Sequence, residues 1–148
     1  IHKQIFTDSG GFDEAFFLFE EETEWEYRMQ KYGWRRVILP DANVIHNHHS
    51  STAKIGNYFR GFHEYRSRIV FWKKHCKGIK RYIRGFLLLS GLILRILFNL
   101  FMYLVSFKKY HLVKLTLIWK LVQMVFANPD KLLQQRYNYD DYKNLFIN

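Results

Sequence analysis

The stretch FLLLSGLILRILFNLFMYLVSF, residues 86–107, decides how the second half of this chain folds. Its 22 residues are mostly apolar and are interrupted by Arg95 and Asn99. At a rise of about 1.5 Å per residue, a helix of this length reaches across a bilayer core of about 30 Å. An arginine near the middle of a span costs about 2.5–3.5 kcal/mol, which the surrounding Leu, Ile and Phe could offset. The stretch therefore predicts a long apolar helix.

Basic residues flank this stretch on both sides, with Lys80, Arg81 and Arg84 before it and Lys108 and Lys109 after it. A single span would place one of these clusters on the side of the membrane where positive charge is disfavoured. A helix in the interface, or a hairpin that enters the membrane and returns, keeps both clusters near anionic headgroups. We therefore expect peripheral or hairpin attachment. A true span and a buried helix of a soluble bundle remain as alternatives.

Two further helices are indicated on either side of the apolar stretch. Over residues 55–76, large apolar side chains recur every three or four positions, at Tyr58, Phe62, Tyr65, Ile69 and Trp72. Over residues 112–126 a similar stripe is made by Leu112, Leu115, Trp119, Val122 and Phe126. Asn128-Pro129-Asp130 is placed to end the second helix, because proline cannot continue it.

Charge divides the 148 residues, whose formal net charge is +10, into two unlike parts. Residues 1–50 carry 5 Lys and Arg against 9 Asp and Glu, whereas residues 51–148 carry 18 against 4. The basic part should seek an anionic partner, either a phospholipid surface or a nucleic acid. Because its cations bracket the apolar stretch, we expect an anionic membrane surface and no nucleic acid. The chain has one cysteine, which excludes an internal disulfide.

The acidic part has a sequence typical of the edge of an α/β sheet. A Gly10-Gly11 turn and an apolar run precede a helix over about 20–32, which Gly33 is placed to end. Sequences typical of strands follow at 34–39 and 43–46, on either side of a turn. This order of helix, strand, turn and strand is typical of part of an α/β domain rather than of a complete sheet.

Two clusters of this part are candidates for chemistry. Four carboxylates stand within five residues, Glu20-Glu21-Glu22-Thr23-Glu24, and their mutual repulsion raises some of their pKa values. Such a carboxylate at the lip of a cleft is a candidate general base, although a solvated helix N-terminus has the same composition. In an extended chain His46 and His48 lie on one face and are candidate metal ligands. Polar loop histidines are the alternative, since no zinc-ligand spacing is present.

The order of these motifs resembles the C-terminal half of the catalytic domain in family 2 glycosyltransferases of the bacterial rhamnosyltransferase-like group. The resemblance covers roughly residues 1–76 and is carried by a GGFDE turn, an aromatic run, an acidic motif, an arginine, a Gly-Trp pair and a PDAxVxH segment. These are Gly10–Glu14, Phe16–Phe19, Glu20–Trp25, Arg28, Gly33-Trp34 and Pro40–His46.

The resemblance implies a GT-A fold and an inverting transfer from a nucleotide-sugar donor to a glycan or lipid-linked acceptor in surface polysaccharide synthesis. It implies that Glu22, with Glu21 before it, activates the acceptor hydroxyl, and that His46, with His48 in reserve, holds a divalent cation such as Mg or Mn. The residues that match the acceptor side are Gly10, Gly11, Asp13, Glu24, Trp25 and Arg28.

The expected architecture is therefore α/β: a partial GT-A sheet edge followed by a helical, membrane-associating region. We expect the C-terminal half of a catalytic domain over 1–54, a basic amphipathic helix and linker over 55–84, and a membrane-associating tail over 85–148. The Asp-any-Asp metal motif of the nucleotide-binding half is absent, so the chain by itself is expected to be inactive. The cytoplasmic face of the bacterial plasma membrane is the expected location. A non-catalytic membrane-anchoring or nucleic-acid-binding module is the alternative.

Overall fold

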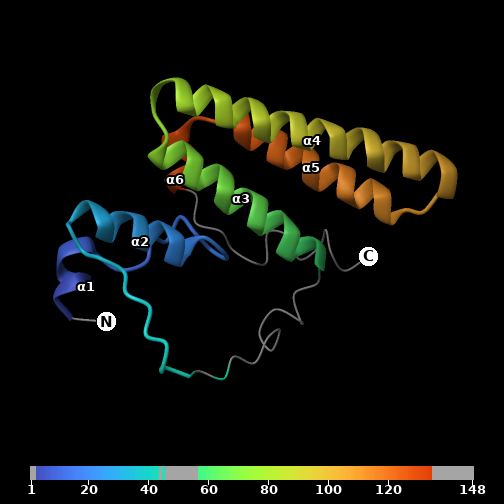
Figure 1. The fold of residues 1–148 in the computed structure, drawn as a ribbon. Helices are drawn as coiled ribbons and strands as arrows, with labels where there is room; N and C mark the ends of the chain where they lie inside the picture. Colours follow the sequence, from blue (N-terminus) through green and yellow to red (C-terminus); the bar gives the residue numbers. More distant parts are fainter. Residues whose placement is uncertain (1–2, 44, 46–56, 135–148) are drawn as a thin grey trace.

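The computed structural model describes residues 3–43, 45 and 57–134. Over these ranges the chain forms six helices and no strand (Figure 1). The helices are α1 (Lys3–Ser9), α2 (Glu21–Lys31), α3 (Asn57–His75), α4 (Gly78–Ser106), α5 (Tyr110–Phe126) and α6 (Pro129–Gln134).

The expectation of an α/β fold with a GT-A sheet edge is wrong. The segment predicted as the first strand, 34–39, has no regular structure, and Val37, Ile38 and Leu39 are 77%, 90% and 69% exposed. A strand needs a neighbour to satisfy its backbone N–H and C=O groups, and the described residues place no other strand beside this segment. The second predicted strand, 43–46, includes residues 44 and 46, which lie outside the described part of the chain.

Helix α2 is confirmed almost at the predicted bounds. Its first turn contains Glu21, Glu22 and Glu24, whose negative charges favour the positive end of the helix dipole. Gly33 follows its last turn with φ +83°, a backbone conformation that side chains with a Cβ rarely adopt.

Helix α3 is the centre of the packed structure, lying between α2 and the pair formed by α4 and α5 (Figure 1). Its buried apolar side chains include Phe62, Ile69, Val70 and Trp72, as the predicted spacing requires. They belong to one core with residues from three other parts of the chain. The run before α2 contributes Ala15 and Phe16, α4 contributes Leu92, and α5 contributes Leu117 and Leu121. The acidic front and the apolar helices therefore share a core.

Helices α4 and α5 run side by side as an antiparallel hairpin (Figure 1). Helix α4 is 29 residues long, about 43 Å, and it begins at Gly78. The basic residues Lys80, Arg81 and Arg84 therefore belong to the same helix as the apolar stretch, and the boundary expected at residue 85 falls within it. At its other end Phe107 adopts a left-handed conformation, φ 52°, and the chain turns back into α5.

The apolar stripe predicted for α5 faces mostly outward. Trp119 and Phe126 are 57% and 73% exposed, whereas Leu117, Leu121 and Val125 pack in the core. Both faces of α5 are apolar, so periodicity alone selected the wrong one. Pro129 then begins the short helix α6, and the Asn128 side chain caps it by accepting a hydrogen bond of 2.8 Å from the Asp130 N–H.

Most of the α4 surface is apolar and open. By its length and composition the helix is long and apolar enough to cross a membrane, and little of its apolar stretch is buried. Large exposed side chains such as Leu94, Leu97, Phe101 and Leu104 lie along it. An apolar surface of this length on one helix is typical of a membrane-associating element.

Candidate functional site

The glycine turn before α2 is fixed by the arginine of α2. Gly10 has φ +70°, which glycine adopts without strain. The Arg28 guanidinium donates hydrogen bonds to the carbonyl oxygens of Ser9 and, at 2.6 Å, of Gly11. A Cβ added to Gly10 would lie 3.4 Å from Arg28 Nη1. The predicted residues Gly10, Gly11 and Arg28 thus form one unit, in which the arginine holds the backbone of the turn.

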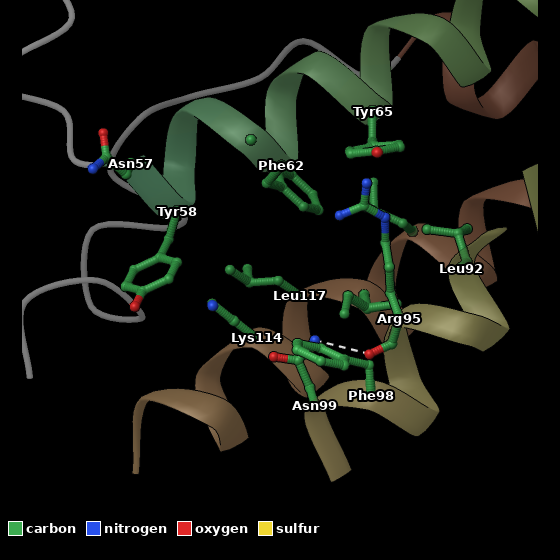
Figure 2. A pocket seen from close by; sticks show the side chains of 13 residues that line it. Asn57, Tyr58, Phe62, Tyr65, Leu92, Arg95, Phe98, Asn99, Lys114 and Leu117 are labelled. Atoms are coloured by element: carbon green, nitrogen blue, oxygen red, sulfur yellow. Dashed lines mark hydrogen bonds between the residues drawn. The ribbon is translucent and has the colours of Figure 1, made fainter. Parts of the chain in front are cut away.

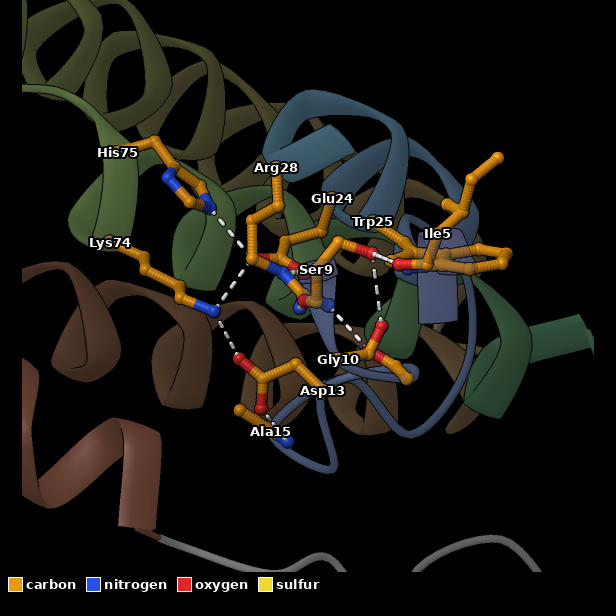
Figure 3. A network of polar contacts seen from close by, with 11 residues as sticks. Ile5, Ser9, Gly10, Asp13, Ala15, Glu24, Trp25, Arg28, Lys74 and His75 are labelled. Carbon is orange, nitrogen blue, oxygen red and sulfur yellow. Dashed lines mark hydrogen bonds and ion pairs between the residues drawn. The ribbon is translucent and has the colours of Figure 1, made fainter. Parts of the chain in front are cut away.

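Glu24 is the centre of the polar network that joins α2 to α3 (Figure 3). Its side chain is fully buried, and Oε2 accepts a hydrogen bond of 2.8 Å from Arg28 Nε. Its other oxygen, Oε1, lies 2.6 Å from Lys74 Nζ and 3.0 Å from His75 Nε2, both on the last turn of α3. A buried carboxylate is stable only with such partners.

Lys74 also forms an ion pair with Asp13, whose other oxygen accepts a hydrogen bond of 2.9 Å from the Ala15 N–H. Burial by itself would raise the pKa values of Asp13 and Glu24. The hydrogen bonds and positive charges around them outweigh burial, so both pKa values lie below the ordinary range. Both carboxylates are therefore ionised at neutral pH and are engaged with Lys74.

For His75, burial affects the pKa more than the opposing effect of Glu24 does. Burial lowers its pKa, the hydrogen bond and charge of Glu24 act against this, and the charges of Lys74 and Lys31 lower it further, so the net shift is downward. At neutral pH the contact between His75 and Glu24 is thus mainly a hydrogen bond with a neutral imidazole.

Trp25 supports the same turn from the other side. Its indole is buried, and Nε1 donates a hydrogen bond of 2.9 Å to Ser9 Oγ. The rings of Phe6 and Phe12 lie against it, with centroid distances of 4.9 and 5.1 Å. Trp25 is therefore an internal support of the turn, a position that its place in the acidic motif did not reveal.

The two carboxylates expected to do chemistry lie at the N-terminus of α2, apart from this network. The side chain of Glu22 is exposed. Glu21 is partly buried, and desolvation raises its pKa, with the negative charges of Glu22 and Glu20 adding to the rise against a hydrogen bond from its own backbone. Phe19 and Glu20, directly before the helix, both have φ 66°, a strained conformation for residues other than glycine.

The strained segment before α2 is held from α3. Arg66 Nη1 donates a hydrogen bond of 2.8 Å to the Ala15 carbonyl, and Ser67 Oγ donates one of 2.7 Å to the Leu18 carbonyl. Arg66, Ser67 and Lys74 fall within the basic helix and linker expected over 55–84, but sequence reasoning paired none of them with the segment before α2. The basic composition of this helix was visible, but its partners lie about fifty residues away, so no local pattern could pair them.

The predicted metal ligands His46 and His48 lie outside the described residues. Within residues 3–43, 45 and 57–134, no three His, Cys, Asp or Glu side chains are grouped so that they could hold a metal ion.

Comparison with known proteins gives one kind of relative. No protein-family model matches the chain, and no solved structure matches it. Over 54 residues, 36% of this chain, the sequence is 35% identical to N-acetylglucosaminyl-diphospho-decaprenol L-rhamnosyltransferase of Mycobacterium tuberculosis, in strains CDC 1551 and H37Rv. The aligned segment is 18% of the length of those proteins. The chain is thus similar, over about a third of its length, to part of a glycosyltransferase.

Proposed function

We propose that this chain supplies the acceptor side and the membrane attachment of a glycosyltransferase that transfers a sugar from a nucleotide-sugar donor to a glycan or lipid-linked acceptor. The local identity to an L-rhamnosyltransferase supports the reaction class. Because the aligned segment is 18% of that relative, the proposal assigns to this chain only part of such an enzyme. Surface polysaccharide synthesis is the process in which we place it.

The observation that carries the proposal is the different state of the carboxylates on α2. Glu24 is buried and neutralised by its partners, so it is occupied by structure. Glu22 is exposed, and none of the ion pairs of the described residues includes it. A base that takes a proton from an acceptor hydroxyl must be accessible and ionised, and Glu22 meets the first condition.

Glu21 and the backbone before it support the same assignment. Two consecutive left-handed residues, Phe19 and Glu20, set the direction in which α2 begins. Strain of this kind persists where the surrounding structure imposes it and is frequent at functional sites. In the proposal Glu22 takes the proton of the acceptor hydroxyl as the new glycosidic bond forms. Glu21, with its raised pKa, stays beside it as a second acidic group.

A divalent cation, Mg or Mn, belongs to the proposal as the group that would neutralise the leaving diphosphate. His46 and His48 are the proposed ligands, and they lie outside the described residues. The donor set around Glu24 does not fit this role, because its carboxylate is already bound by Lys74 and Arg28.

The membrane part of the proposal places the α4–α5 hairpin along the cytoplasmic face of the bacterial plasma membrane. It is supported by the open apolar surface of α4 and by basic residues at both of its ends. A helix in the interface keeps Lys80 and Lys108 at the headgroups at once. A lipid-linked acceptor would then reach the protein from the membrane on which it lies.

Replacing Glu22 by Gln tests the assigned base. We expect transfer of labelled L-rhamnose to N-acetylglucosaminyl-diphospho-prenol, by membranes containing the whole protein, to fall by about a hundredfold or more. Gln retains the shape of Glu but accepts no proton, and general base catalysis contributes about 10²–10⁴-fold. The matched control is Glu26→Gln on the same helix, where the carboxylate forms an exposed ion pair with Arg36.

The control variant should keep transfer within about twofold, because exposed ion pairs contribute little. Transfer by Glu22→Gln that remains close to wild type would remove Glu22 from the mechanism. If Glu21→Gln alone abolishes transfer, the base is Glu21. If the unaltered protein transfers none of a panel of sugars to lipid-linked acceptors, the reaction class itself is wrong.

A further inference from the structure

A cavity of about 270 Å³ lies between α3, α4 and α5 (Figure 2), and no residue of α2 lines it. Its walls include Phe62 of α3, Leu92 and Phe98 of α4, and Leu117 and Leu121 of α5. Pockets for whole small molecules usually measure about 300–1,000 Å³. This cavity is therefore small for a sugar nucleotide and of a size suited to one compact group.

Two cationic side chains enter this apolar cavity from different helices. Figure 2 shows Arg95 of α4 directed toward Tyr65, and Lys114 of α5 directed toward Tyr58. The Arg95 guanidinium carbon lies 4.8 Å from the centre of the Tyr65 ring. Lys114 Nζ lies 4.9 Å from the Tyr110 ring and 5.6 Å from the Tyr58 ring. Aromatic faces stabilise these cations without neutralising them.

Among the described residues, no carboxylate is paired with either of these charges, those of Arg95 and Lys114. Between Glu64 and Asp130 the sequence has no acidic residue at all, so α4 and α5 offer none nearby. Two positive charges beside one apolar cavity attract an anion, and Arg and Lys are the usual partners of phosphate.

A buried polar contact joins α4 to α5 beside the cavity. Asn99, 6% exposed, donates a hydrogen bond of 2.8 Å to the Arg95 carbonyl (Figure 2). Its side-chain oxygen lies 3.3 Å from Nδ1 of His111, which is also buried. The helix that carries Arg95 and the helix that carries Lys114 are thereby joined beside the cavity.

The apolar wall continues from the cavity to the outside of α4. Phe98 lines the cavity and is itself 61% exposed. Leu94 and Phe101 lie four residues before it and three residues after it on the same helix face, and they are 67% and 62% exposed. A ligand whose charged group enters the cavity thus has an apolar surface beside it along which an aliphatic chain would lie.

We propose that this cavity binds the phosphate of a lipid, with Arg95 and Lys114 contacting the phosphate oxygens and the lipid chain lying along the exposed face of α4. The ligand class is an aliphatic phosphate ester, either a phospholipid such as phosphatidylglycerol or a prenyl phosphate. This binding site goes beyond the transfer proposed above, and its test does not measure transfer.

The test uses the full chain in detergent and counts bound lipid by native mass spectrometry and calorimetry. The probes are dioctanoyl phosphatidylglycerol, farnesyl phosphate and inorganic phosphate. We expect one lipid per chain. Arg95→Gln and Lys114→Gln should each weaken binding about tenfold, because each removes one charge-assisted contact, and the double variant more. Lys114→Arg, which keeps the charge, should bind within about threefold of wild type.

The matched control is Lys120→Gln with Lys131→Gln, which removes two charges at positions on α5 and α6 that do not line the cavity. It should bind within about twofold of wild type, and circular dichroism of every variant should match that of the wild type. A preference for either lipid supports the site and identifies its source. The proposal is overturned if the cavity double variant binds like wild type, if the control pair loses as much, or if inorganic phosphate binds as tightly as either lipid.

Discussion

Glutamates that are close together in the sequence of α2 have very different surroundings. Glu24 is buried against Lys74, His75 and Arg28, whereas Glu22, two residues earlier, is exposed. The four carboxylates were predicted as one cluster, because local composition distinguishes none of them. Their difference arises from α3, which brings cations of the last turn to one position of α2 and not to the next.

Replacing Glu24 by Gln should destabilise the protein by about 2–4 kcal/mol. The change leaves Lys74 and Arg28 close together without their shared carboxylate, and their side chains are only 25% and 20% exposed. Chemical unfolding in detergent, followed by tryptophan fluorescence, measures the effect. Glu22→Gln, at an exposed position of the same helix, should change the free energy of unfolding by no more than about 0.5 kcal/mol. Equal effects of the two substitutions would contradict the role assigned to Glu24.

At the scale of elements, the join between α3 and α4 depends on a contact between an indole and a glycine. Trp72 of α3 is 7% exposed, and its Nε1 donates a hydrogen bond of 2.9 Å to the Arg81 carbonyl of α4. A Cβ on Gly85 would lie 2.8 Å from the Trp72 ring. The hydrogen bond fixes the indole, so the ring has little freedom to move away.

Gly85→Ala should therefore destabilise the protein by about 1–2 kcal/mol, because overpacking outweighs the better helix propensity of alanine. Gly91→Ala in the same helix is the control, since no atom lies within 4 Å of its added Cβ. That substitution should stabilise the protein by up to about 1 kcal/mol. Thermal unfolding followed by circular dichroism compares the two. A Gly85→Ala variant that melts above the wild type would show that the indole moves freely.

The elements that were predicted correctly are those that depend on local sequence. Helices α2, α3 and α5 follow from apolar spacing and from the residues at their ends, and the apolar stretch correctly indicated α4. The strand predicted at 34–39 was wrong because a strand depends on a distant partner, about which its own residues carry no information. Within the site, the sequence located the turn at Gly10-Gly11 and singled out Arg28, but it did not predict that Arg28 binds the backbone of the turn. The contacts from α3, in which Lys74 binds Asp13 and Ser67 binds the Leu18 carbonyl, were not predicted either.

At the scale of the whole molecule, the described residues form an acidic front and an apolar hairpin on opposite sides of α3 (Figure 1). The front contributes Ala15 and Phe16 to the same core as Leu92 and Leu121 of the hairpin. The arrangement leaves the long apolar face of α4 open, which agrees with attachment of the hairpin along a membrane surface.

Attachment along one surface predicts that both ends of α4 face the same side of the membrane. In a Cys76→Ser background, Lys80→Cys and Lys108→Cys should both react with a membrane-impermeant maleimide in inverted vesicles, and neither should react in intact spheroplasts. A membrane-permeant maleimide, which should label both positions in both preparations, is the control for reactivity. Labelling of the two positions from opposite sides would show that α4 crosses the bilayer.

The last turn of α3 links α2 to the end of the hairpin. Lys74 and His75 bind Glu24 of α2, while Lys73 of the same turn donates a hydrogen bond of 2.5 Å to the Ala127 carbonyl at the end of α5. The last turn of α3 is thus bonded both to α2 and to the end of α5. In the proposed attachment, the depth of the hairpin in the bilayer would therefore also set the height of the α2 N-terminus above it. An acceptor anchored in that bilayer would meet Glu22 at one fixed height. Acceptors would therefore be selected by the length of the segment between their lipid anchor and the hydroxyl that reacts.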